Sequence, residues 1–449
     1  MNNKLLSPHG HPIQTAPLAA AIVTAAAFGK LFVPFYLIGS TAIFVFLCAT
    51  GLALIALNWR SIRQDARYAY DALAIMSVLY VAYATSYLVH SSNQVPITQM
   101  FGVLIFHSLF ILFGFAAAHS LTAVFIVLLG QAAIYLIYVV RYVIEMGDVM
   151  QNGFLQNIFH IEDISLAGSL HNHIAGALGL ALISLFGFRS RAVRFLAFAM
   201  LPFVFFYILH LSARTTLIAL VLAFSFLVWA ELWLISKKWA LISIAALILL
   251  AVAGSTLFYR FALMDENAHL GTPNIIARTI REIQRDSKRE HPGDRLPMWG
   301  RAWHRLTSDP RQFVLGRGVG AFPIDEGAGA PDWLLRKTKA ASYSPHNVHL
   351  EVLYESGIFA LLAFSLLTLF PLVYALKYWA RFEAAEKAAI AFYAFYLVSA
   401  DISGNFAYGY DFQFFLALAI GVISIERRRF AEAQSRLLGP LDAKVSLLE

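Results

Sequence analysis

Charged residues are scarce in this sequence. Asp, Glu, Lys and Arg make up 14% of its 449 residues, whereas 59% are hydrophobic. Soluble globular domains carry about 25% charged residues, and a soluble protein this apolar would expose large hydrophobic patches. The composition therefore excludes an ordinary soluble enzyme or binding protein, and it indicates that lipid surrounds much of the chain.

Cysteine and internal repetition are also rare or absent. The single cysteine, Cys48, lies inside an apolar run, so no disulfide can form within one molecule. We interpret it as a small buried side chain. The sequence has no internal repeat and no low-complexity run. Many transporters contain repeated halves with interrupted helices, so this absence argues against a lipid-linked glycan flippase or transporter, which stays as the non-enzyme alternative.

Long apolar runs dominate what is present. A helix needs about 20 apolar residues to cross the roughly 30 Å of bilayer hydrocarbon. A window of that length predicts about twelve transmembrane helices, at 16–34, 36–57, 70–90, 98–117, 120–140, 171–188, 194–211, 214–235, 239–258, 349–375, 386–405 and 409–425. The predicted fold is therefore an all-α polytopic membrane protein.

Lys and Arg gather in the even-numbered short connections between these spans, except in the fourth, near His119, which has none. The positive-inside rule places such connections in the cytoplasm. The basic residues in question are Arg60, Arg63, Arg67, Arg189, Arg191, Arg194, Lys237, Lys238, Lys377, Arg381, Lys387, Arg427, Arg428 and Arg429. We therefore expect both termini in the cytoplasm, with Lys30 and Arg214 as exceptions on the outer side.

Two segments interrupt the succession of spans. The first, 142–170, mixes acidic and apolar residues and predicts an amphipathic helix on the outer face. The second is a loop too long for the positive-inside rule to apply, with helical patterns at 275–290 and 297–307. The predicted organisation is transmembrane helices one to nine within 1–258, a large helical periplasmic loop domain at 259–348, helices ten to twelve within 349–425, and a cytoplasmic tail at 426–449.

The first candidate group for binding or catalysis surrounds Arg214. This arginine lies between two apolar spans, with the hydroxyls of Ser212 and Thr215 beside it and His210 one helical turn before it. Arginine binds phosphate through two parallel hydrogen bonds. The alternative is an interfacial arginine that reaches the lipid headgroups.

The second candidate group lies in the large loop. Arg295 stands where the chain enters a predicted helix, a position that favours anion binding, although a plain surface arginine is the alternative. The residues predicted to share one side of this helix are Trp299, Trp303 and Leu306. The glycines of the stretch Gly316–Gly320, which contains Arg317, permit a turn there.

The third candidate group stands at the start of the tenth span. His346 is expected near the outer water interface, where a neutral imidazole can act as a general base. His349 follows three residues later, and a structural or metal-binding role for the two histidines is the alternative. No third ligand and no acidic cluster accompany them, so we expect neither metal nor cofactor. Pairing with basic residues is expected for Glu351, Glu355 and Asp401.

These segments together resemble the O-antigen ligase and polymerase superfamily, whose members are multi-span bacterial inner-membrane glycosyltransferases with one large periplasmic loop before a late span. The resemblance covers about 170–425. The matching positions are Ser212-x-Arg214, Asp294-Arg295 with Trp299 and Gly316-x-Gly-x-Gly320, and His346-Asn347 followed after nine residues by Gly357. The last of these motifs is typical of the ligase branch, from which the sequence departs at Ala360.

The resemblance implies a GT-C-like O-antigen ligase. Such an enzyme transfers a glycan from undecaprenyl pyrophosphate to a sugar hydroxyl of lipid A–core, with inversion and without metal, on the periplasmic face of the inner membrane. It implies that His346 activates the acceptor hydroxyl and that Arg214 and Arg295 bind the pyrophosphate. Further candidates for binding pyrophosphate or acceptor are Ser212, Asn347, His349, Trp299, Arg317 and His210. An O-antigen polymerase and an O-linked protein oligosaccharyltransferase are the alternatives within the superfamily.

Overall fold

The computed structural model describes most of the chain. The described residues are 15–28, 40–90, 97–146, 164–210, 214–264, 280, 295–327, 345–403, 406 and 409–445. Within them the regular secondary structure is helical and contains no strand. This agrees with the all-α fold expected from the apolar runs.

Each predicted span overlaps one long helix. These helices are α1 (Thr15–Phe28), α3 (Ser40–Leu57), α5 (Tyr70–Val89), α6 (Ile97–Ala117), α7 (Leu121–Met146), α9 (Ile164–Gly187), α10 (Arg191–His210), α11 (Arg214–Ile235), α12 (Lys237–Met264), α18 (Val348–Tyr378), α19 (Ala384–Ser403) and α20 (Tyr410–Val445). The shorter elements are α4 (Trp59–Ala66), η2 (Arg67–Ala69), η3 (Ala118–Ser120), α14 (Arg295–Thr307), α15 (Pro310–Leu315) and α16 (Ala321–Gly327).

Some of these helices are long and apolar enough to cross a membrane. Among the described residues, four segments meet this criterion by length and hydropathy: Trp59–Val89, Met100–Ile137, Thr215–Ile235 and Val348–Tyr378. Three shorter apolar helices accompany them, at Thr15–Phe28, Ala42–Leu57 and Ile174–Gly187. The protein is therefore a helical membrane protein, and the total of twelve spans stays a prediction.

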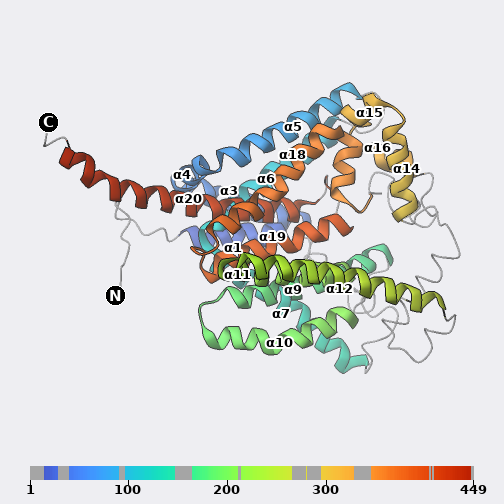
Figure 1. The fold of residues 1–449 in the computed structure, drawn as a ribbon, viewed down its shortest axis with the longest axis horizontal. Helices are drawn as coiled ribbons and strands as arrows, with labels where there is room; N and C mark the ends of the chain where they lie inside the picture. Colours follow the sequence, from blue (N-terminus) through green and yellow to red (C-terminus); the bar gives the residue numbers. More distant parts are fainter. Residues whose placement is uncertain are drawn as a thin grey trace.

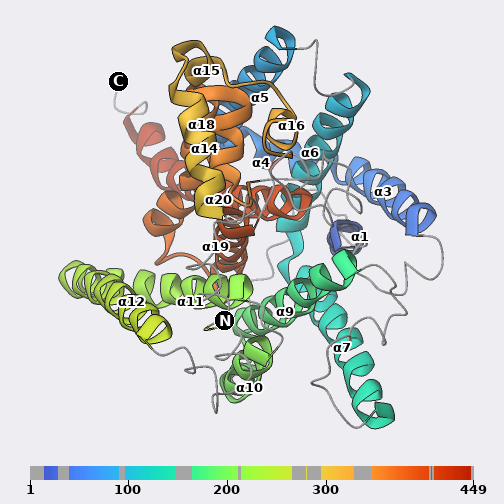
Figure 2. The ribbon, with the colours of Figure 1, turned by 90° about the vertical axis from the view of Figure 1, so that its right-hand side faces the viewer.

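The long helices run along one direction, with the short helices of the large loop at one end. In Figure 1, α14, α15 and α16 lie at the right-hand end and the C-terminus lies at the left. Figure 2 looks onto the end that carries α14. Helix α19 occupies the middle, because it packs against α9 and α11 as well as against α18 and α20. The start of α18 is thereby brought to the same end of the molecule as the large loop.

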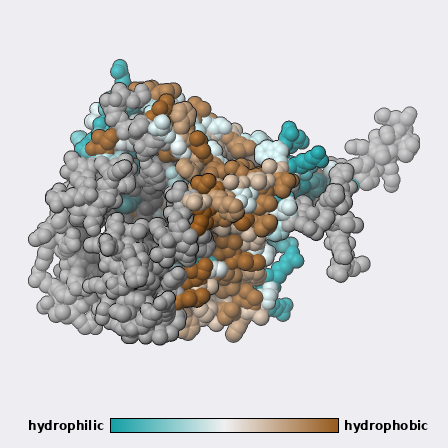
Figure 3. All heavy atoms as spheres, turned by 180° about the vertical axis from the view of Figure 1, so that it is seen from behind, coloured by the Kyte–Doolittle hydropathy of each residue, from teal (hydrophilic) through white to brown (hydrophobic). Residues whose placement is uncertain are grey.

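Helix α18 shows why the surface of this bundle is apolar. Residues at 359, 362, 366, 369 and 373 follow helical spacing, and each is more than half exposed. On the other side of the helix, Ala360, Phe364 and Leu367 are buried in the core. Figure 3 shows a broad hydrophobic band across the middle of the molecule, with hydrophilic residues beyond it. Such a band is what lipid contact requires.

The basic connections meet at the C-terminal end. Three consecutive arginines of α20 each pair with a different element: Arg427 with Asp71 on α5, Arg428 with Asp65 on α4, and Arg429 with Glu386 on α19. Arg189–Glu383 and Lys387–Glu231 join further connections. The loops predicted to be cytoplasmic therefore lie together on one side of the bundle.

The structure also changes several predicted boundaries. Helix α7 continues to Met146 and α9 begins at Ile164, so both ends of the predicted amphipathic segment 142–170 belong to long helices, and 147–163 lie outside the described residues. The helix expected at 275–290 also lies outside them, apart from the buried Ile280. Helix α20 extends to Val445, well beyond the predicted end at 425.

Candidate functional site

His346 stands at a backbone turn directly before α18. Its φ is 53°, and among the described residues it is the single non-glycine residue with positive φ. The left-handed region is unfavourable for residues with a Cβ, and it is seen mainly where the surroundings enforce it. Asn347 follows as the N-cap of α18, because its side-chain Oδ1 accepts a hydrogen bond of 2.7 Å from the Leu350 amide. The helix start is thus well defined.

The turn at His346 is held by two other helices. Trp299 of α14 donates from Nε1 to the carbonyl oxygen of Pro345 at 2.7 Å. On the other side, Asn347 donates from Nδ2 to the carbonyl oxygen of Asp401 at 3.0 Å. Both neighbours of His346 are therefore held by residues far away in the sequence: Pro345 through its carbonyl oxygen and Asn347 through its side-chain amide. Trp299, predicted as a substrate-binding residue, has a structural contact to the site.

His349 and Asp401 form a pair beside this turn. The His349 Nδ1 atom lies 2.5 Å from Asp401 Oδ1, and the His349 ring packs edge-on against Phe364. Because a carboxylate accepts the hydrogen bond, Nδ1 carries the proton and Nε2 is the remaining ring nitrogen. The prediction that Asp401 pairs with an arginine was wrong: its described side-chain partner is this histidine.

Helix α18 is broken at Gly357, and the glycine-rich stretch docks into the break. Gly357 has φ 80° and ψ −175°. Next to the break, the amide of Arg317 donates to the Tyr354 carbonyl at 2.8 Å, and the amide of Gly318 donates to the Glu355 carbonyl at 3.1 Å. A Cβ on Gly357 would lie 2.1 Å from the Val314 carbonyl oxygen. Glycine is therefore required for this close approach.

The residues with positive φ all lie in the motifs found in the sequence. Within the described part of the chain they are His346, Gly316, Gly318, Gly320 and Gly357. All of them belong to the glycine-rich stretch or to the His346-Asn347…Gly357 motif. The two motifs thus form one structural unit, in which the glycine-rich stretch packs against the short helical segment between His346 and Gly357.

Two buried carboxylates on this segment hold backbone groups. Glu351 accepts a 3.0 Å hydrogen bond from the Phe406 amide. Glu355 accepts hydrogen bonds from the amides of Gly320 and Phe322. For Glu355 the expected basic partner was wrong, whereas for Glu351 it stays a prediction. Both glutamates bind backbone N–H groups, which joins α18 to the start of α16 and to the segment after α19.

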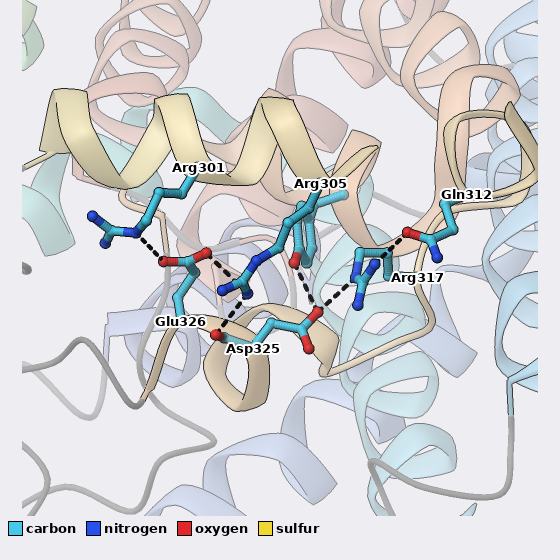
Figure 4. Close-up of polar contacts among 7 residues, drawn as sticks. Arg301, Arg305, Gln312, Arg317, Asp325 and Glu326 are labelled. Carbon is cyan, nitrogen blue, oxygen red and sulfur yellow. Dashed lines mark hydrogen bonds and ion pairs between the residues drawn. The ribbon is translucent and has the colours of Figure 1, made fainter. Parts of the chain in front are cut away.

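A network of charged residues connects the helices of the large loop (Figure 4). Arg301 and Arg305 of α14 pair with Glu326 of α16 at 3.0 and 3.1 Å. Arg317 donates from Nε to Asp325 Oδ2 at 2.7 Å. The hydroxyl of Tyr354, on α18, donates to the same oxygen at 2.7 Å. Asp325, Glu326 and Tyr354 were not singled out from the sequence. Nothing in the local sequence shows which residues such side chains contact in the folded protein.

Arg317 stays charged in this network. Partial burial opposes its charge, but the hydrogen bond to Asp325 and the negative charge nearby raise the pKa of the guanidinium above its ordinary value. Its Nη1 also contacts Gln312. Arg317 was predicted to bind substrate, and the structure gives it protein partners at two of its nitrogens.

The helix expected at 297–307 is confirmed as α14, with a different buried face. Met298, Ala302 and Leu306 are fully buried against α16 and α18, at a spacing of four residues. Trp303 is 52% exposed, so the prediction that it shares the buried side with Leu306 was wrong.

The remaining predicted site residues are described in part. Arg214 is the first residue of α11 and Arg295 the first residue of α14, and for both the structure describes the backbone alone. The same holds for His210, the last residue of α10, whereas Ser212 lies outside the described residues. Helix α11 packs against α12 and leads into it through the short connection at Ser236, so α11 begins at the end where α12 enters the large loop (Figure 1). Both arginines thus enter helices near the end that carries His346.

Among the described residues, no group of three or more His, Cys, Asp or Glu side chains is placed to hold a metal ion.

Comparison with known proteins identifies one family. Residues 203–365 match the model of the O-antigen ligase family. The matched segment begins within α10 and ends within α18, and it contains Arg214, Arg295, the glycine-rich stretch, His346 and Gly357. No curated protein matches the sequence. Over this segment the chain is similar to the O-antigen ligase family, and the match supports membership of that family.

Proposed function

We propose that this protein is an O-antigen ligase of the bacterial inner membrane. It transfers a glycan from undecaprenyl pyrophosphate to a sugar hydroxyl of lipid A–core, with inversion at the anomeric carbon and without a metal ion. The family match supports a membrane glycosyltransferase of the O-antigen ligase and polymerase superfamily. The choice of donor, acceptor and catalytic residues is our proposal.

The backbone of His346 is the observation that carries this proposal. A residue in the left-handed region is retained where its surroundings enforce it, and such residues concentrate at functional sites. Here Trp299 binds the carbonyl oxygen of the preceding residue, Pro345, and Asp401 binds the side-chain amide of the following residue, Asn347. A general base must be held in one orientation to accept a proton efficiently. The position of His346 fits that requirement.

In the proposed reaction, the acceptor hydroxyl attacks the anomeric carbon of the donor while His346 accepts the hydroxyl proton. A glycosidic bond forms, and the bond from the anomeric carbon to the pyrophosphate oxygen breaks. The electron pair of that bond stays on undecaprenyl pyrophosphate. Arg214 and Arg295 bind this leaving group and stabilise the negative charge that grows on it. One direct displacement inverts the anomeric configuration.

The placement of both arginines supports their role. Each is the first residue of a helix, where unpaired backbone N–H groups favour an anion. Arg214 comes from α11 and Arg295 from the large loop, so a pyrophosphate between them would join the membrane helices to the loop. Arginine can bind each phosphate group through two parallel hydrogen bonds.

The proposed topology completes this picture. We propose twelve GT-C-like transmembrane helices, both termini in the cytoplasm, and the site at the periplasmic surface. The ion pairs of Arg427, Arg428 and Arg429 with α5, α4 and α19 support a common cytoplasmic end for the basic connections. The large loop, at the opposite end (Figure 1), is then periplasmic.

A ligation assay with purified protein tests the proposal. Undecaprenyl-pyrophosphate-linked glycan is supplied as donor, and lipid A–core, a second lipid-linked glycan, or a protein is offered as acceptor. We expect transfer to lipid A–core. Transfer to glycan alone would make the protein a polymerase, and transfer to protein alone an oligosaccharyltransferase. Movement of the donor across vesicles without any transfer would make it a flippase.

Variants of the proposed base and of the arginines test the mechanism. His346→Ala should lower kcat by about 10²–10⁴-fold, whereas His304→Ala, an exposed histidine of α14, should leave it unchanged. Arg214→Lys and Arg295→Lys keep the charge and lose the paired hydrogen bonds, so they should raise the KM for donor and lower kcat. Full activity of folded His346→Ala would show that His346 is not the base.

A further inference from the structure

Asp401 contacts two residues of the first turn of α18. Its carbonyl oxygen accepts from the Asn347 side chain at 3.0 Å, and its carboxylate binds His349 Nδ1 at 2.5 Å. Asp401 lies near the end of α19, 52 residues from His349. One residue of another helix therefore holds the residues that directly follow His346.

These contacts determine how the turn is oriented. The Asn347 amide has its oxygen on the Leu350 amide and its nitrogen on Asp401, so its orientation is defined at both ends. The Asp401 carboxylate in turn fixes the ring of His349. A rotation of either side chain would release Asn347 from its capping position or His349 from α19. Both side chains therefore constrain the chain that directly follows His346.

The location of the pair suits a role at the site. His349 and Asp401 retain 28% and 34% side-chain exposure, so the pair borders the outer end of the bundle rather than its core. An acidic residue in an apolar membrane helix is costly unless it has a specific partner. Further along both helices, apolar packing and a hydrogen bond from the Tyr393 hydroxyl to the Thr368 carbonyl already join α18 to α19, so stability does not require a charged pair at this end.

We propose that Asp401 is a positioning residue for His346, acting through His349 and Asn347. The proposal rests on the proposed function, in which His346 is the general base. Loss of the Asp401 carboxylate frees His349 and loosens the first turn of α18, so His346 leaves its productive orientation. The donor and acceptor sites remain, because Asp401 does not contribute to them.

Kinetics of purified variants provide the first test. Asp401→Ala should lower kcat by about 10–100-fold, the usual range for loss of a residue that orients a functional group, with KM for donor and acceptor within about twofold. Asp401→Asn keeps an acceptor for His349 and should recover part of the loss. Asp71→Ala is the matched control, because Asp71 ties α5 to Arg427 and to Tyr374 at the opposite end of α18. It should lower thermal stability and leave kcat unchanged.

A double-mutant cycle with His346→Ala separates positioning from structure. If Asp401 acts through His346, Asp401→Ala should cost nothing further in the His346→Ala background. If the losses of kcat caused by the two substitutions multiply in the double variant, the proposal is overturned. A loss of stability with unchanged kcat in Asp401→Ala would also overturn it. Full activity of His346→Ala would instead reject His346 as the base, so the two failures are distinguishable.

Hydrogen exchange provides a readout that does not need activity. Asn347 protects the Leu350 amide, so Asp401→Ala should speed exchange in peptides covering 345–350 and leave those of α14 unchanged. Unchanged exchange at 345–350 in the folded variant would also overturn the proposal.

Discussion

His346 and Gly357 bound the first helical segment of α18, and both have positive φ, 53° and 80°. Between them, the Tyr354 hydroxyl binds Asp325 of α16, and the His349 ring binds Asp401 of α19. Carbonyl oxygens of the segment accept hydrogen bonds from the glycine-rich stretch and from α5. One of these bonds runs from the Ser86 hydroxyl to the Glu355 carbonyl at 2.5 Å. The histidine and the glycine of one sequence motif therefore mark the two positions where the backbone leaves helical geometry, and other segments pack closely at both.

Gly357→Ala should strongly destabilise the protein. The substitution forces a residue with a Cβ into the left-handed region, at about 1–2 kcal/mol, and places that Cβ against the Val314 carbonyl. Thermal unfolding of the purified protein in detergent measures the loss. Gly300→Ala is the control, because a Cβ there meets nothing within 4 Å and α14 is helical at that position. It should be neutral or slightly stabilising, and equal stability of the two variants would contradict the role of Gly357.

Asp325→Ala should loosen the large loop. Arg317 and Tyr354 both bind its Oδ2 atom, so the substitution leaves a partly buried guanidinium without its carboxylate. We expect a cost of about 2–3 kcal/mol in the free energy of unfolding. Tyr354→Phe removes one hydrogen bond and should cost about 1 kcal/mol. Thermal stability and the rate of proteolysis in the α14–α16 region measure both effects, and a milder effect for Asp325→Ala would refute this account.

Arg428→Met should destabilise the opposite end of the bundle. Its partner Asp65 is fully buried, and its Oδ1 lies 2.6 Å from the Arg428 Nε atom. An uncompensated buried carboxylate costs about 3–5 kcal/mol. Because this pair is distant from the proposed site, KM values of the surviving folded protein should stay unchanged. Arg189→Ala is the control: its guanidinium is 80% exposed, and its ion pair with Glu383 should contribute nothing measurable.

The topology can be tested with introduced cysteines. Cys48 is the single cysteine and is buried, so a Cys48→Ala background is suitable. Ser308 and Ser435 are both exposed, between α14 and α15 and on α20 respectively. In intact cells with a permeable outer membrane, an impermeant maleimide should label Ser308→Cys, whereas Ser435→Cys should react after the inner membrane is opened. The reverse pattern would invert the proposed orientation.

Much of the fold could be predicted because its signals are local. Apolar runs of the required length predicted the long helices, and α18 and α14 begin close to the predicted positions. The site was predicted as three separate groups, and the family match confirms the family recognised in them. Partners were harder to predict. Basic partners were expected for Asp401, Glu351 and Glu355. The negative charge of a carboxylate does not by itself tell whether its partner is an arginine, a histidine or a backbone N–H group.

Sequence alone was sufficient for the class of protein, the helical segments, the family and the residues worth testing. Those follow from hydropathy, from the length that a membrane imposes on a helix, and from motif spacing. Tertiary structure alone decided which residues meet. The left-handed turn at His346, the break at Gly357 and the pair of His349 with Asp401 each depend on segments far apart in the chain. An unfavourable backbone conformation such as that of His346 persists where packing from several helices enforces it. A local pattern of residues does not show which helices pack there.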